Sequence, residues 1–128
     1  MLKPVRRIVT GHDAAGRSVF IADGDAPNVL PALATPKMSL TLVWRTTASP
    51  AAWDGDQETA PAGLRVPTAP QQHGGSVFRI ADFPPDSELG DLSQVDMARH
   101  GVQVSAAGRQ RHVLFHTTDT VDYAIVLE

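Results

Sequence analysis

The residues best suited to chemistry gather near the end of the sequence, in the segment HTTDTVDYAIVLE. It contains one histidine, His116, and two carboxylates, Asp119 and Asp122. Alternate residues of a β-strand share a face, so one face here is predicted to carry His116, Thr118, Thr120 and Asp122. Imidazole and carboxylate groups on one face suit a divalent transition metal such as Fe, Mn, Ni or Zn. They equally suit metal-free acid–base chemistry by a histidine beside a carboxylate.

The same residues also have a purely structural interpretation. His116 and Asp122 could hydrogen-bond the backbone at a strand edge, and threonine is common in strands for its shape alone. Two ligands are too few to close a metal site. The remaining histidines form no nucleophile or phosphate-binding arrangement with their neighbours. The segment by itself therefore leaves a reactive site and an ordinary strand edge both open.

Strand-type runs separated by turns must position these residues. Residues 5–11 and 17–24 are predicted to form a hairpin, because only a short connection with Asp13 and Gly16 joins them. Residues 38–47 alternate apolar and polar side chains, which predicts a half-buried strand. Its core face is predicted to carry Leu40, Leu42 and Trp44. Trp44 is accordingly assigned to the core or to the wall of a pocket.

Three further strands are predicted, at residues 76–85 and in the closing runs HVLFHT and DYAIVLE, the last of them buried. Residues 25–36 contain three prolines and predict an irregular arm. Residues 48–75 form a long loop rich in Pro, Gly and Ala, of a length usual for flaps or partner-contacting arms. Asp91 is placed to cap one short helix over residues 92–100. The pattern predicts a mainly β sandwich or barrel with one helix.

Composition bounds the function classes. The chain has 128 residues, which suits one domain spanning residues 1–128. Its net charge is −3, and its basic residues form no stripe of the kind that binds nucleic acid. No apolar run is long enough to cross a bilayer, and the N-terminus has no secretory signal. Cysteine is absent, which fits a reducing compartment. These observations predict a cytoplasmic protein that binds neither nucleic acid nor membrane.

The closing segment resembles the first motif of the cupin superfamily, which reads His-x-His, then Glu, then a strand ending Val-Leu-Glu-Gly. Aligned on Val126-Leu127-Glu128, His116 takes the place of the first metal-ligand histidine and Asp122 that of the glutamate. Three further blocks resemble a subgroup of small cupins of mostly unassigned function: RRIVTGHDAAGRSVFIADG, LVWRTT and GGSVFRIADFPP. The four blocks are ordered and spread over nearly the whole chain. The resemblance implies a jelly-roll β-barrel around a small-molecule pocket.

Two departures from the cupin pattern change what the resemblance implies. Thr118 stands where the family has its second histidine ligand, and a hydroxyl binds a divalent metal weakly. The second cupin motif, which supplies the last histidine ligand, is not in the sequence, so the barrel is expected to be incomplete at the C-terminus. An incomplete barrel exposes the edge of its last strand, which favours pairing with another chain. We expect a homodimer formed through Tyr123–Leu127.

Two functions follow as expectations. The first is binding of a small organic molecule in a barrel pocket lined by Thr118, Thr120 and Trp44. An isomerase, dehydratase or decarboxylase-type enzyme of this kind would use His116 and Asp122, with or without a divalent transition metal. The second is a non-catalytic cupin remnant that acts as a strand-pairing dimerisation or binding module. Cupin folds host many chemistries, so the fold does not identify the reaction.

Overall fold

The computed structural model describes residues 4–32, 37–52, 57–65, 74–92, 106–112 and 114–127. The chain divides into two compact units. The first comprises Met1–Arg65 and Gln72–Asp91, and the second comprises Val66–Gln71 and Leu92–Glu128. Among the described residues, no helix is long and apolar enough to cross a membrane.

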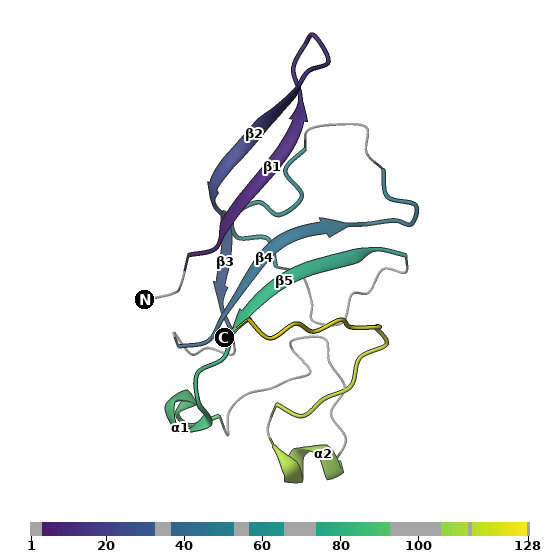
Figure 1. Ribbon diagram of the computed structural model, residues 1–128. Helices are drawn as coiled ribbons and strands as arrows, with labels where there is room; N and C mark the ends of the chain where they lie inside the picture. Colours follow the sequence, from purple (N-terminus) through teal and green to yellow (C-terminus); the bar gives the residue numbers. More distant parts are fainter. Residues whose placement is uncertain are drawn as a thin grey trace. The chain divides into compact units, whose positions relative to one another are not determined.

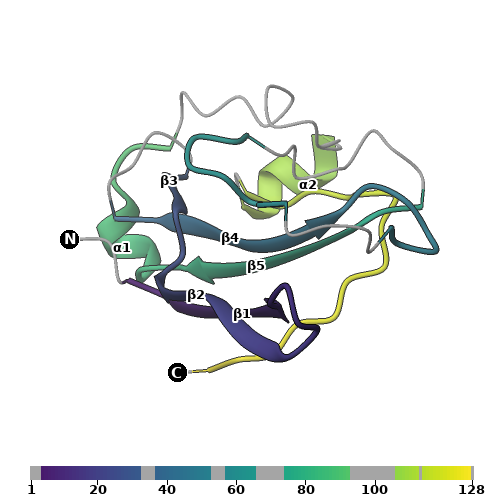
Figure 2. The same cartoon turned by 90° about the horizontal axis from the view of Figure 1, so that it is seen from above.

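The predicted β-rich architecture is confirmed, and its sheets belong to the first unit (Figure 1). One antiparallel sheet pairs two strands, β1 (Arg6–His12) and β2 (Ser18–Asp25). The other has the order β3-β4-β5, with bounds Asn28–Pro31, Ser39–Thr46 and Ser76–Asp82. Figure 2 shows β4 and β5 running side by side along their length. The described strands form two open sheets, so the jelly-roll barrel stays a prediction.

The hairpin predicted at the start of the chain is confirmed, and its turn is organised by Asp13. The Asp13 carboxylate accepts hydrogen bonds from the backbone N–H groups of Ala15 (2.9 Å) and Arg17 (3.0 Å). It also accepts one from Arg17 Nε at 2.8 Å. Gly16 has φ +76°, a backbone conformation that glycine adopts without steric cost. An acidic turn residue and a glycine thus connect β1 to β2 as the sequence indicates.

The predicted inward face of β4 is confirmed at Leu42, which is buried, but is wrong at Trp44, because the strand contains a β-bulge. The register shifts between Leu42 and Trp44, which leaves Val43 as the additional residue. Thr41 pairs with Ile80 and Trp44 pairs with Phe78, two residues apart on an uninterrupted β5. Trp44 therefore shares its face with Thr41, not with Leu42, and is 37% exposed, which contradicts its assignment to the core. On the predicted outer face, Ser39 and Thr41 are fully buried.

β3 lies in the stretch predicted to be an irregular arm. It occupies the edge of its sheet, where it pairs Asn28 with Leu42 and Pro31 with Ser39. An edge strand tolerates proline, since only one of its sides needs backbone donors. The three prolines therefore shorten the strand to four residues without preventing it.

Two short helices are described, neither of them in the predicted position. α1 (Asp86–Leu89) follows Pro84 and Pro85 and buries Leu89. α2 (Ala106–Arg111) lies in the second unit. The helix expected over residues 92–100 lies outside the described residues from position 93 onward, as does Trp53 of the long loop.

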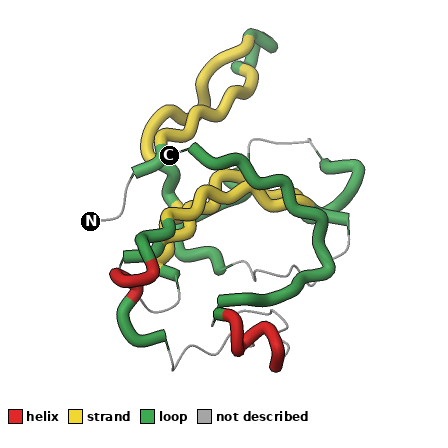
Figure 3. The backbone as a smooth tube through the Cα atoms, turned by 60° about the horizontal axis from the view of Figure 1, so that its bottom comes forward, coloured by secondary structure: helices red, strands yellow, loops and turns green. Residues whose placement is uncertain are grey.

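The described residues of the two closing strands predicted from the sequence do not form strands. Residues 114–127 run as a loop after α2, with a single bridge residue at Thr117 (Figure 3). Tyr123 is 93% exposed and Val126 88%, so the predicted burial of this segment is also wrong. A strand needs a neighbour for its backbone N–H and C=O groups, and residues 121–127 pair with no described strand.

Candidate functional site

Local hydrogen bonds after α2 orient His116. The Leu114 N–H donates to Nδ1 of His112 at 3.2 Å, and Nδ1 of His116 lies 2.6 Å from the carbonyl oxygen of Leu114. A carbonyl oxygen can only accept, so Nδ1 of His116 carries the proton of this bond. In the neutral ring the lone pair is then on Nε2. The His116 side chain is exposed, so a molecule from solvent can reach this nitrogen.

Two threonine hydroxyls lie beside this histidine in sequence. The Oγ1 atoms of Thr118 and Thr120 are 2.6 Å apart, and both residues are half-buried. His116 is exposed, so it does not share the half-buried setting of the two threonines that the predicted strand face would give it. The two threonine hydroxyls thus lie together on one side of this segment, while their assignment to a pocket stays a prediction.

Asp122 does not complete the predicted group. It is exposed, and no hydrogen bond joins it to His116 among the residues that the structure describes. The sequence pattern predicts that His116 and Asp122 share one face of a strand. Because this segment is not a strand, nothing in its backbone holds the two side chains on the same side. Trp44, the remaining predicted pocket residue, belongs to the first unit.

The described residues do not fit the metal that the cupin resemblance implies. They contain no group of three or more His, Cys, Asp or Glu side chains placed to hold an ion. Thr118, in a ligand position of the family, hydrogen-bonds Thr120 instead. We therefore derive no chemical step through a metal.

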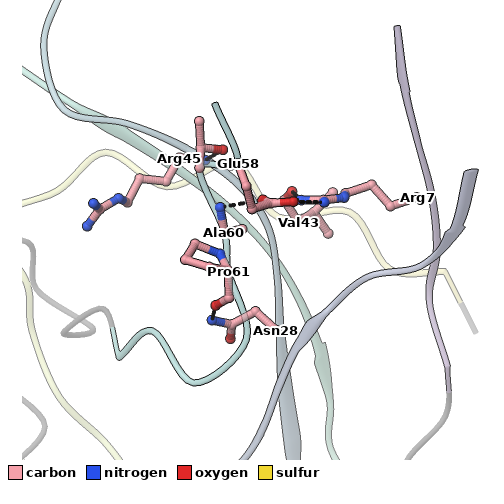
Figure 4. Close-up of polar contacts among 8 residues, drawn as sticks. Arg7, Asn28, Val43, Arg45, Glu58, Ala60 and Pro61 are labelled. Carbon is pink, nitrogen blue, oxygen red and sulfur yellow. Dashed lines mark hydrogen bonds and ion pairs between the residues drawn. The ribbon is translucent and has the colours of Figure 1, made fainter. Parts of the chain in front are cut away.

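A second polar cluster, which the sequence did not predict, lies in the first unit (Figure 4). Arg7 of β1 has a side chain only 6% exposed. Its Nη1 donates to Oε1 of Glu58 at 2.9 Å and to the carbonyl oxygen of Val43 at 3.1 Å. Its Nη2 donates to Oε2 of Glu58, which completes a two-pronged ion pair. One buried guanidinium thus joins β1 both to the bulge of β4 and to the loop that carries Glu58.

The ion pair changes the titration of both partners. The hydrogen bond from Arg7 holds the pKa of Glu58 below its ordinary value of 4.5, against the opposing effect of burial. Oε1 of Glu58 also accepts the Ala60 N–H at 2.7 Å. The pKa of Arg7 is raised, chiefly by its hydrogen bonds to Glu58. Both groups are charged and fully engaged, which suits holding the loop and not transferring a proton.

Asn28 of β3 binds the same loop at a second point. Its Nδ2 donates to the carbonyl oxygens of Pro61 at 2.6 Å and Leu64 at 2.9 Å, and the residue is fully buried. We call residues 57–65 the fastened loop. It is part of the long loop predicted at residues 48–75, and here it is held by side chains from β1 and β3. Neighbouring residues of a strand point to opposite faces, so the pair Arg6-Arg7 could have indicated that one arginine points inward. Nothing in the sequence indicates the partner of that arginine.

Comparison with known proteins gives distant relatives. No family model matches the chain. Two proteins of Diaporthe leptostromiformis, named phomopsin biosynthesis cluster protein C' and phomopsin biosynthesis cluster protein D, are each 29% identical to it over 130 residues. In both cases the match covers 99% of this chain and 55% of the relative. The chain thus spans about half the length of the curated relatives it matches.

Proposed function

We propose that the chain is a cupin-like protein that binds a small organic molecule at residues 116–122 and acts on it by acid–base chemistry. The carrying observation is the contact of His116 Nδ1 with the Leu114 carbonyl oxygen, which leaves Nε2 as the basic nitrogen of an exposed side chain. An imidazole held at one nitrogen presents the other in a defined direction. That is the arrangement a general base requires.

Each neighbouring group has a distinct role in this proposal. Nε2 of His116 would accept a proton from the bound molecule, and the hydroxyls of Thr118 and Thr120 would hydrogen-bond its polar groups. Asp122, exposed in the same segment, would serve as the second acid–base group. Isomerisation, dehydration and decarboxylation all use such a set. The relatives are named for a biosynthesis cluster, which favours a small-molecule role for this chain as well.

The test is a fragment screen read at the histidine side chains by NMR. We expect compounds with a polar group next to an acidic C–H to shift the His116 ring signals while leaving those of His12, an exposed histidine of β1, unchanged. His116→Gln should abolish binding, whereas the matched His12→Gln variant should retain it. The proposal would be contradicted if compounds shifted the ring signals of both histidines equally, or if no compound shifted those of His116.

The second candidate function is a strand-pairing dimer in the cytoplasm. It is favoured by the five residues from Tyr123 to Leu127, four of whose side chains are large, apolar and between 73% and 93% exposed. Such an extended segment can add to the sheet edge of a second copy. Light scattering across a range of concentrations tests this candidate. The native chain should dimerise and Ile125→Lys should remain monomeric, and a native chain that stays monomeric would exclude it.

A further inference from the structure

The register of β4 and β5 places an aromatic pair and a hydroxyl on one sheet face. Trp44 is opposite Phe78, and the next row pairs Thr41 with Ile80. Residues directly opposite each other in an antiparallel pair have Cβ atoms about 5 Å apart, so the two aromatic side chains form one surface. Trp44 is on this face because of the bulge at Val43.

The aromatic pair is open to solvent and electrically neutral. Phe78 is 59% exposed and Trp44 37%. The row beyond it holds the hydroxyls of Thr46 and Ser76, which lie 2.9 Å apart and bond each other. A neutral surface with two exposed π-systems favours a planar ring, which gains stacking energy in addition to the burial of apolar area.

Thr41 adds an unmet hydrogen-bonding capacity one row inward. The residue is fully buried, and within the part of the chain that the structure describes its Oγ1 has no partner. A buried polar atom without a partner costs free energy that a ligand atom can recover. Of all the described buried side chains, only Asn28 shares this condition, and its amide nitrogen is already bonded.

We propose that this face binds a planar aromatic ring that carries a hydroxyl, with the ring on Trp44 and Phe78 and the hydroxyl bonded to Thr41. The two rows are about 7 Å apart along β5, which a ring substituent and a hydrogen bond of about 2.8 Å together span. The half-buried side chain of Ile80, opposite Thr41, must rotate to admit the substituent. This site lies within the first unit and contains none of residues 116–122, so the inference goes beyond the proposed function.

The probes are phenol, toluene and cyclohexanol, which separate ring stacking from hydrogen bonding. The reporter is the indole N–H signal of Trp44, distinguished from that of the only other tryptophan by a Trp53→Phe variant. Phenol should bind at least threefold more tightly than either toluene or cyclohexanol. Equal affinity for phenol and cyclohexanol would overturn the stacking role, and equal affinity for phenol and toluene would overturn the role of Thr41.

Matched variants locate the ring. Phe78→Leu keeps an apolar side chain but removes the second π-system, and should weaken phenol binding at least fivefold. Phe83→Leu is the matched control, because Phe83 is 64% exposed and lies outside the paired rows. This variant should change the affinity for phenol less than twofold. Equal losses in the two variants would overturn the proposal. Thr41→Val keeps the shape and should bring phenol within twofold of toluene, and an unchanged preference for phenol would contradict the assigned hydrogen bond.

Two further measurements separate this inference from its alternatives. His116→Gln should leave phenol binding at Trp44 unchanged, so a failed histidine screen with a positive phenol titration would refute the proposed chemistry but not the ring site. A shift of the Trp44 signal on dilution without any probe would show that a second copy covers this face. That result would overturn the inference.

Discussion

The fastened loop and the segment 121–127 both lack regular secondary structure, yet their surroundings are opposite. The fastened loop is bonded by Arg7 and Asn28, two buried polar side chains that reach it from separate strands. Segment 121–127 is predominantly apolar and exposed, and it pairs with no described strand. The buried side chains of Arg7 and Asn28 hold this irregular loop in place by donating hydrogen bonds to its carboxylate and carbonyl oxygens. Apolar composition alone does not have that effect.

Removing Arg7 should give the largest effect on this comparison. Arg7→Met keeps the apolar stem but loses the bonds to Glu58 and Val43, and we expect a loss of about 2–3 kcal/mol in the free energy of unfolding. Urea denaturation measures it. The matched variant Arg6→Met breaks an exposed ion pair with Asp23 and should change stability far less. Similar losses in both variants would show that the buried pair does not hold the loop.

Removing the second attachment should loosen the loop more locally. Asn28→Ala loses two hydrogen bonds to the loop, and we expect a destabilisation of about 2 kcal/mol. Hydrogen exchange should rise at the Leu64 amide, which donates to Pro61 at 3.2 Å. Exchange at Ala26, whose N–H bonds to Val5 away from the loop, should rise less. A uniform rise at both amides would indicate global unfolding and not release of the loop.

Acid should weaken the same attachment. Because the folded-state pKa of Glu58 is depressed, the unfolded chain binds this proton first as the pH falls below about 4.5. The contribution of Glu58 is therefore complete above that pH and is lost as the pH drops through the folded-state pKa. Stability measured between pH 6 and pH 3 should fall less steeply for Glu58→Gln than for the native chain. Asp13, whose pKa is lowered chiefly by the Arg17 N–H, contributes in the same direction and should be unaffected by that variant.

The smallest effect is expected in segment 121–127. Ile125 is 83% exposed, so Ile125→Lys should change the stability of the monomer by no more than about 0.5 kcal/mol. Thermal unfolding at low protein concentration checks this value. A large loss there would mean that the segment packs in solution, which would remove the contrast with the fastened loop.

The sequence predicts elements that depend on neighbours along the chain, and fails where distant residues decide. The β1–β2 hairpin follows from Asp13 and Gly16, which act within their own turn. The bulge at Val43 depends on the register with β5, and the Arg7–Glu58 bond joins residues 51 positions apart. No periodicity reveals either of them.

The candidate site shows a similar limit. The bond between Thr118 and Thr120 joins residues two positions apart, but the predicted strand would hold them about 7 Å apart, so the strand pattern does not indicate it. The partnership of His116 with Asp122 required a strand ladder, and the described segment has none. The orientation of His116 comes instead from the backbone of Leu114, a contact that side-chain patterns do not report.

Val43 has a consequence for how this chain can change by insertion or deletion. Its carbonyl oxygen accepts a hydrogen bond from Arg7, and the bulge leaves it outside the ladder, between the pairs that Leu42 and Trp44 form with β5. Deleting this one residue would join Leu42 directly to Trp44, which would give β4 a regular ladder with Trp44 still opposite Phe78, but it would remove the carbonyl oxygen that Arg7 binds. The attachment of β1 therefore depends on this additional residue, whereas the aromatic surface would survive its loss.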